Sequence, residues 1–164
     1  IHAQVITGQQ LLEKSIQYHD PKDKWDKFKG TLLLKETRPN GADRQSVLKL
    51  DNKKKYFYLD QNRAGYRIEK TVKNNACTYK VNGSTTVPDS LVQKFRLTCS
   101  QLQRIRNYYI YLWGMPMKLK DAGTQIHEKV SATTFQGAEV LSMKVTYDKS
   151  VGKDIWYFYF NPKN

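Results

Sequence analysis

Apolar residues recur at helical spacing in two parts of the chain. Near the start, Thr7 and Gln10 have the spacing of a capping box, and the apolar residues after them predict an amphipathic helix that ends at Asp20-Pro21. The second helical segment is predicted at residues 88–114. The apolar side chains that fall on one side of its longer helix are Leu102, Ile105, Tyr109, Leu112 and Trp113.

The rest of the chain shows the short alternating patterns of strands separated by polar turns. Five strands are predicted before the helical segment, at residues 28–38, 45–50, 56–61, 66–72 and 76–81, and three after it, at residues 125–131, 138–147 and 155–160. Because hairpins join successive strands, we expect an antiparallel sheet with the helices on one face. The predicted fold class is α+β: a curved antiparallel sheet, an incomplete and unclosed barrel, wrapped around helices in one domain of residues 7–164.

The last predicted strand, residues 155–160, contains five consecutive aromatic residues. Alternate side chains point to opposite faces of a strand, so both faces of this one are apolar. Asn161-Pro162 then has the composition of a turn into another strand. Either the sheet ends on an exposed aromatic edge, which favours aggregation, or the parent protein continues past Asn164. We expect the second, and with it a fold truncated at the C-terminus.

Composition narrows the class of protein. A length of 164 residues allows one domain with a sizeable core, and the abundant aromatic residues are typical of a β-rich globular protein. The formal net charge is +13, but the basic residues are dispersed and the only run is Lys53-Lys54-Lys55. This dispersion argues against a nucleic-acid partner and favours weak attraction to an anionic membrane or glycan surface. No apolar stretch approaches the ~20 residues of a transmembrane segment.

Two features point to export. Residues 1–6 look like the end of a secretory signal, with the small residue Ala3 before the cleavage site; the alternative is a short disordered tail or a cloning remnant. A disulfide between Cys77 and Cys99 would close a loop of roughly 20 residues and stabilise the fold by about 3 kcal/mol. The alternative is two buried thiols, and we predict the disulfide. With two cysteines and no neighbouring histidine pair, no zinc site is predicted.

Several phrases of the sequence resemble an uncharacterised family of secreted proteins of Gram-negative bacteria. They are residues 7–16 (TGQQLLEKSI), residues 18–21 (YHDP), the segment from Arg106 to Asp121, Tyr147-Asp148 and the strand from Gly152 to Pro162. This resemblance covers nearly the whole chain and implies export to the periplasm or outer membrane, but it brings no established activity. The order of elements is also similar, by architecture alone, to the lipoprotein-carrier (LolA/LolB-like) fold, in which an unclosed antiparallel barrel holds an apolar cavity capped by helices. Both resemblances imply further strands after Phe160.

Catalytic motifs are not found in the sequence. The three histidines are not spaced as metal ligands, no serine lies in a nucleophile elbow, and no glycine-rich phosphate loop is present. His19 is interpreted as a residue at a helix C-terminus, and His127 as a surface or rim residue of a strand. We therefore expect a protein that is not an enzyme and uses no cofactor and no metal.

The candidate site is a cluster of aromatic and methionine side chains. Its members are Tyr109, Trp113, Met115, Met117, Trp156 and Phe158. Methionine adapts to varied apolar partners, and Tyr and Trp suit the rim of an amphipathic pocket. Facing one another across a curved sheet, these side chains would line a pocket for an acyl chain, with lysines at its rim. The alternative is that they belong to an ordinary core.

The sequence thus predicts a non-catalytic periplasmic or outer-membrane-associated protein that binds a hydrophobic ligand, lipid or lipidated protein in the concave face of its sheet. The rival hypothesis is an accessory subunit of a larger cell-envelope protein complex that docks through its aromatic edge strand. A third hypothesis, an enzyme, would require a site completed by residues beyond Asn164.

Overall fold

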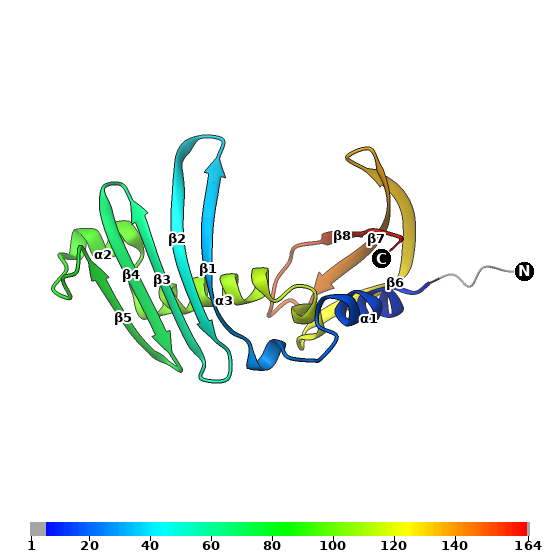
Figure 1. Cartoon of the computed structure of the whole chain (residues 1–164), viewed down its shortest axis with the longest axis horizontal. Helices are drawn as coiled ribbons and strands as arrows, with labels where there is room; N and C mark the ends of the chain where they lie inside the picture. Colours follow the sequence, from blue (N-terminus) through cyan, green and yellow to red (C-terminus); the bar gives the residue numbers. More distant parts are fainter. Residues whose placement is uncertain (1–5, 164) are drawn as a thin grey trace, which may run out of the picture. The chain divides into compact units, whose positions relative to one another are not determined.

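The chain forms two compact units, and a computed structural model describes its residues 6–163, apart from the side chains at positions 38 and 42. The terminal unit consists of Ile1–Asp23 and Gly114–Asn164, and the central unit of Lys24–Trp113. Their elements are labelled in Figure 1. The predicted signal remnant, residues 1–6, lies outside the described residues except for Ile6. The assignment of residues 7–164 to one domain stays a prediction.

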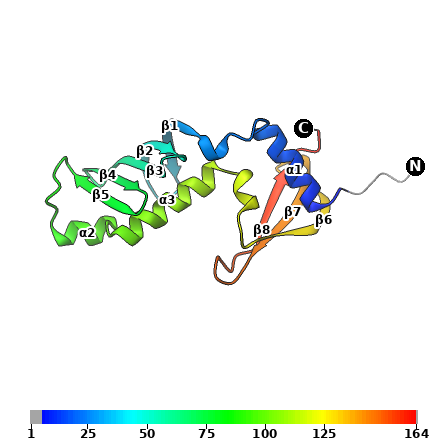
Figure 2. The same cartoon turned by 90° about the horizontal axis from the view of Figure 1, so that it is seen from below.

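The central unit contains a five-stranded antiparallel sheet and two α-helices. Its strands lie in chain order: β1 (Lys29–Arg38), β2 (Gly41–Asp51), β3 (Tyr56–Arg63), β4 (Tyr66–Lys73) and β5 (Ala76–Val81). A 3-10 turn, η1 (Trp25–Lys27), precedes β1. The helices α2 (Asp89–Phe95) and α3 (Cys99–Trp113) follow β5, and Figure 2 shows both along one face of the sheet. The helices therefore form the second layer that the sheet needs to bury its apolar face.

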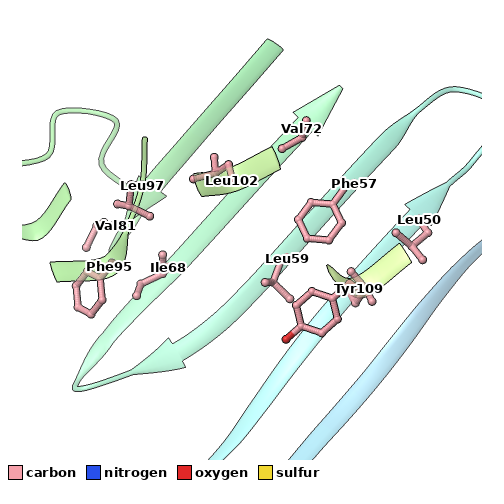
Figure 3. Packing of buried hydrophobic residues seen from close by; sticks show 11 residues of the cluster. Leu50, Phe57, Leu59, Ile68, Val72, Val81, Phe95, Leu97, Leu102 and Tyr109 are labelled. Carbon is pink, nitrogen blue, oxygen red and sulfur yellow. The ribbon is translucent and has the colours of Figure 1, made fainter. Parts of the chain in front are cut away.

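The core of the central unit lies between α3 and the inward face of this sheet. In β3 and β4 every second side chain is buried, as the period of a strand requires. Figure 3 shows these side chains with those of the helices, and the rings of Phe57 and Tyr109 have centroids 6.2 Å apart. The buried members are Leu48, Leu50, Phe57, Leu59, Ile68, Val72, Val81, Phe95, Leu97, Leu102 and Tyr109. Their removal from water, at ~25 cal/mol per Å² of apolar surface, is the main force that holds α3 on the sheet.

A disulfide joins the first residue of α3 to the edge strand of the sheet. Cys77 in β5 is bonded to Cys99, with a Cα–Cα distance of 5.4 Å and a sequence separation of 22. The predicted disulfide is therefore confirmed. The bond closes the segment that contains α2 and fixes the start of α3 against β5.

In the terminal unit, a helix packs on a three-stranded antiparallel sheet. The elements are α1 (Gly8–His19), the 3-10 helix η2 (Met117–Lys120), and the strands β6 (Thr124–Phe135), β7 (Ala138–Tyr147) and β8 (Trp156–Phe160), with β7 in the middle of the sheet. α1 contacts β6 and β7. Leu11 and Leu12 of α1 are buried, as are Met143 and Val145 of β7. These side chains form the apolar layer of the unit.

The start of α1 matches the predicted capping box. The hydroxyl of Thr7 accepts the backbone N–H of Gln10 at 3.2 Å, and the side-chain oxygen of Gln10 accepts the backbone N–H of Thr7 at 3.0 Å. Two N–H groups that the helix leaves without an internal partner are thereby satisfied. Gly8, next to the cap, is buried against the irregular part of β6, where the register to β7 shifts between Ile126 and Val130.

The fold class is confirmed: the protein is α+β, its strands are antiparallel, and the described strands form no closed barrel. The strands divide into one sheet of five and one of three. Element boundaries differ in places from the prediction. β2 begins at Gly41 because the turn before it is short enough for Arg38 to pair with Gly41, and β6 continues to Phe135, paired with Ala138. The expected truncation at the C-terminus stays a prediction.

Removing the disulfide is expected to destabilise the central unit. The double variant Cys77→Ser/Cys99→Ser should lose about 3 kcal/mol of unfolding free energy, because its unfolded chain is no longer constrained by the cross-link. Urea denaturation of the variant and of the oxidised protein measures the difference. Equal unfolding free energies in the two proteins would contradict the expectation.

Gly8 is expected to tolerate no larger residue. A Cβ atom at this position would overlap the backbone carbonyl of His127, so Gly8→Ala forces α1 away from β6. We expect a loss of roughly 1–3 kcal/mol, as for other overpacked sites. The matched control is Gln9→Ala on the exposed side of the same helical turn, which should change stability by less than about 0.5 kcal/mol. The expectation fails if both variants unfold at the same urea concentration.

Candidate functional site

The six residues of the predicted pocket are divided between the two units. Tyr109 and Trp113 belong to α3 of the central unit; Met115, Met117, Trp156 and Phe158 belong to the terminal unit. Tyr109 is a buried member of the central core, whereas Trp113 and Trp156 are exposed by 42% and 50%. Met115, Met117 and Phe158 are half-buried. The pocket that these residues were expected to form stays a prediction.

A groove in the terminal unit is a candidate site that the sequence did not indicate. It has a volume of about 480 Å³ and lies between α1 and the adjoining ends of β7 and β8. We call it the α1 groove. Its lining residues are Ile6, Leu11, Lys14, Ser15, Tyr18, His19, Leu141, Tyr159, Phe160, Asn161, Pro162 and Lys163. The volume falls within the range of about 300–1,000 Å³ that is usual for small-molecule sites.

Helical spacing places the first wall of the α1 groove. Leu11, Lys14, Ser15 and Tyr18 are separated by three, four and seven residues, so they share one side of α1. Leu11 is 6% exposed and forms the floor, whereas Tyr18 is 62% exposed and stands at the rim. This wall is therefore apolar at its base and amphipathic at its mouth.

Strand pairing places the second wall. Leu141 of β7 and Phe160 of β8 are direct partners across the sheet, and both are half-buried. Leu141 is in phase with the buried residues Met143 and Val145, so it lies on the face of the sheet that α1 covers. On the other face the ring of Tyr159 stacks on Phe135 with centroids 4.5 Å apart, which fixes the end of β8.

The charges around the α1 groove have one sign. Lys14 and Lys163 line it, His19 adds an imidazole, and no acidic side chain is among the described lining residues. An apolar floor with cationic groups at the rim is complementary to a molecule that has an apolar chain and an anionic end.

A second group of polar side chains lies on the inward face of the central sheet. Arg44 donates two hydrogen bonds to Glu36, at 2.6 and 2.7 Å. The side-chain amide of Gln61 donates to the hydroxyl of Ser46 at 3.1 Å and to that of Tyr109 at 3.4 Å. Ser46, Gln61 and Tyr109 are all buried. We call these five residues the polar cluster.

Lys70 lies on the same face and has no such partner. Its side chain is 1% exposed, and its neighbours in the sheet register are Leu59 and Tyr79. Burial, together with the guanidinium groups of Arg63 and Arg44, lowers the pKa of Lys70 to about 8. A signal for this site was present in the sequence, because Lys70 is in phase with Ile68 and Val72 in an otherwise apolar stripe.

His127, interpreted as a surface or rim residue, is half-buried in β6 and begins a row of hydrogen bonds. Its Nε2 lies 2.9 Å from the hydroxyl of Thr146, which donates to Gln125, and Gln125 donates to Asp148 at 2.7 Å. The row joins β6, β7 and the turn after β7. Each of these side chains is hydrogen-bonded to the next, so we interpret the row as a structural feature that stabilises the sheet.

Across residues 6–163, no three side chains of the types His, Cys, Asp and Glu are grouped so that they could hold a metal ion. Among the helices of the described part of the chain, none has the length and apolar character needed to cross a membrane.

Comparison with known proteins places the chain in a family. The model of a family of unknown function (DUF6503) matches residues 1–164. The chain belongs to this family. No curated protein and no solved structure matches it. Membership of this DUF6503 family agrees with the expectation of an uncharacterised family. The likeness to lipoprotein carriers and the location in the cell envelope stay predictions.

Replacing Lys70 is expected to stabilise the protein at neutral pH. Its pKa is lower in the folded chain than the ordinary value of 10.5, so between about pH 8 and 10.5 the unfolded chain binds more protons and stability rises with pH. Below about pH 8 the full penalty of the buried charge is present. Lys70→Met should therefore raise the unfolding free energy at pH 7 by on the order of 3 kcal/mol.

The measurement is urea denaturation from pH 6 to 11 for the wild type and Lys70→Met. Both proteins share the cations that lower the pKa of Lys70, Arg63 and Arg44, and its register partner Tyr79, so the difference between the two curves reports Lys70. The difference in unfolding free energy between Lys70→Met and the wild type should become smaller as pH rises from about 8 to 10.5. A constant gap, or a less stable variant at pH 7, would show that Lys70 is not penalised by burial.

Proposed function

We propose that this protein is a non-catalytic binding protein for a hydrophobic ligand, a lipid or a lipidated protein, and that it acts in the periplasm or at the outer membrane. The observation that carries the proposal is the α1 groove, with its apolar floor and its rim of Lys14, His19 and Lys163. The disulfide supports an oxidising compartment, because such bonds are rare in the cytosol. The net charge of +13 supports attraction to anionic lipid surfaces.

A single acyl chain is the ligand that suits this groove best. Each methylene removed from water contributes ~0.8 kcal/mol, so part of a chain on the floor of the groove supplies useful affinity. The lysines at the rim then face the anionic end of the ligand. The proposed ligand class is the one expected for the pocket around Tyr109 and Trp113, but the proposed site is the α1 groove.

Binding of a fluorescent fatty acid tests the proposal. Tyr18→Ala removes the exposed ring at the rim. We expect it to weaken the binding of dansyl-labelled undecanoic acid roughly tenfold, equivalent to ~1.4 kcal/mol of binding free energy. Tyr108→Ala is the matched control, because Tyr108 is 59% exposed against 62% for Tyr18 but lies on α3. Equal affinities in Tyr18→Ala, Tyr108→Ala and the wild type would exclude the α1 groove as the site.

A variant that fills the groove distinguishes specific binding in the groove from nonspecific adsorption to the protein surface. Ser15→Trp places a large apolar side chain into the α1 groove. If the acyl chain occupies the groove, this variant should lose probe binding, because the volume is filled. If the probe only adsorbs to apolar surface, the added ring should leave binding equal or stronger.

A second candidate function is favoured by one observation. β8 lies at the edge of the three-stranded sheet, and its residues Trp156, Tyr157 and Tyr159 are 50%, 54% and 44% exposed. An exposed edge strand of this kind suits docking by strand addition, as in an accessory subunit of an envelope assembly. Native mass spectrometry of the protein from its own envelope distinguishes the two: a releasable mass in the lipid range favours the binding protein, and a stoichiometric protein partner without lipid favours the subunit.

A further inference from the structure

Another cavity lies on the outer face of the central sheet, opposite the face along which α2 and α3 run in Figure 2. It has a volume of about 530 Å³ and lies at one end of the sheet, beside the turn between β2 and β3. We call it the lysine pocket, because four lysines line it: Lys29, Lys49, Lys54 and Lys73. The volume is within the range of about 300–1,000 Å³ that is usual for small-molecule sites.

Strand register explains why residues from four strands meet at this pocket. One row of direct pairing partners crosses β1, β2, β3 and β4 at this end of the sheet: Lys29, Asp51, Tyr56 and Lys73. Side chains that are direct partners lie on the same face, so all four border the same surface. Neighbouring strands are about 4.8 Å apart, which separates the backbones of Lys29 and Lys73 by roughly 14 Å. The pocket therefore has a cation at each end of the row.

The other two lysines lie between these ends. Lys49 precedes Asp51 by two residues in β2 and so shares its face. The ammonium group of Lys49 lies 5.3 Å from the ring centroid of Tyr58, its partner on that face. Lys54 belongs to the turn between β2 and β3, and its backbone N–H donates to the carboxylate of Asp51 at 3.0 Å. This hydrogen bond holds the turn against the end of the row.

The lining of the pocket is strongly cationic. Four lysines and one carboxylate, that of Asp51, give the lining a net charge of +3. The ion pairs found within residues 6–163 involve other side chains, so no carboxylate there neutralises any of the four lysines. Cations gathered on one concave surface concentrate the electrostatic field and attract counter-ions. The pocket is thus complementary to an anion with several negative charges.

The residue types favour phosphate over carboxylate. A lysine ammonium is a compact point charge that suits phosphate, whereas planar, bidentate recognition of carboxylate is typical of arginine. No arginine is among the described lining residues. Thr31 and Tyr56 add hydroxyl groups to the lining, and hydroxyl groups donate to phosphate oxygens. Since the cations at the two ends of the row are far apart, they are placed to hold different phosphate groups of one molecule.

We propose that the lysine pocket binds a molecule with two or more phosphate groups, as a soluble compound or as phosphate headgroups at a lipid surface. The ammonium groups donate to the phosphate oxygens, and the ligand supplies the counter-charge that the outer face of the sheet lacks. This site belongs to the central unit, whereas the α1 groove belongs to the terminal unit. It does not rest on the proposed acyl-chain function.

Calorimetry with sodium tripolyphosphate, at constant ionic strength set by sodium chloride, tests the site on the full chain. The double variant Lys49→Gln/Lys73→Gln removes two charges from the pocket and should weaken binding at least tenfold. The matched control is Lys53→Gln/Lys80→Gln, which removes two charges from the same unit outside the lining and should weaken binding less than twofold. All four substituted lysines are exposed, so both variants should fold, which far-UV circular dichroism checks.

Two further probes define the ligand. Citrate, a tricarboxylate, should bind at least tenfold more weakly than tripolyphosphate. Vesicles of phosphatidylcholine with phosphatidic acid separate the sources of phosphate: binding of tripolyphosphate alone indicates a soluble ligand, and vesicle binding that Lys49→Gln/Lys73→Gln loses indicates lipid headgroups. The proposal is overturned if neither probe binds the wild type, if citrate binds as tightly as tripolyphosphate, or if the two double variants bind alike.

Discussion

The packing of α3 against the inward face of the five-stranded sheet is the interaction on which the central unit depends. A sheet with one apolar face must cover it, and this helix supplies most of the cover. Its start is bonded to β5 through Cys77 and Cys99, and Tyr109 near its end reaches Phe57 in β3. The helix is therefore fixed to the sheet by a covalent bond at its start and by an aromatic contact nearer its end.

In the terminal unit a helix also covers an antiparallel sheet, but the unit has fewer strands and helices than the central unit. α1 contacts β6 and β7, while β8 lies at the edge of the sheet beside them. One helix is too narrow to cover three strands, so a groove remains where α1 meets the ends of β7 and β8. The incomplete cover leaves the α1 groove open beside β8. Gly8, which lets α1 approach β6 closely, sets the position of the groove wall.

The α1 groove combines two physical forces that suit different parts of the proposed ligand. Apolar burial would supply the affinity, and the lysines at the rim would orient the anionic end. For a family of unknown function, this environment gives chemistry that can be tested without a known substrate.

The sequence by itself determined the local structure. The capping box at Thr7, the order of helices and strands, and the pairing of two cysteines all follow from spacing and composition, which are properties of neighbouring residues. The tertiary structure alone decided the burial of individual side chains. Tyr109 and Trp113 are one helical turn apart with similar chemistry, yet one is 5% exposed and the other 42%. Lys70 and the α1 groove likewise depend on segments far apart in the chain, because a face is buried only when another element packs on it.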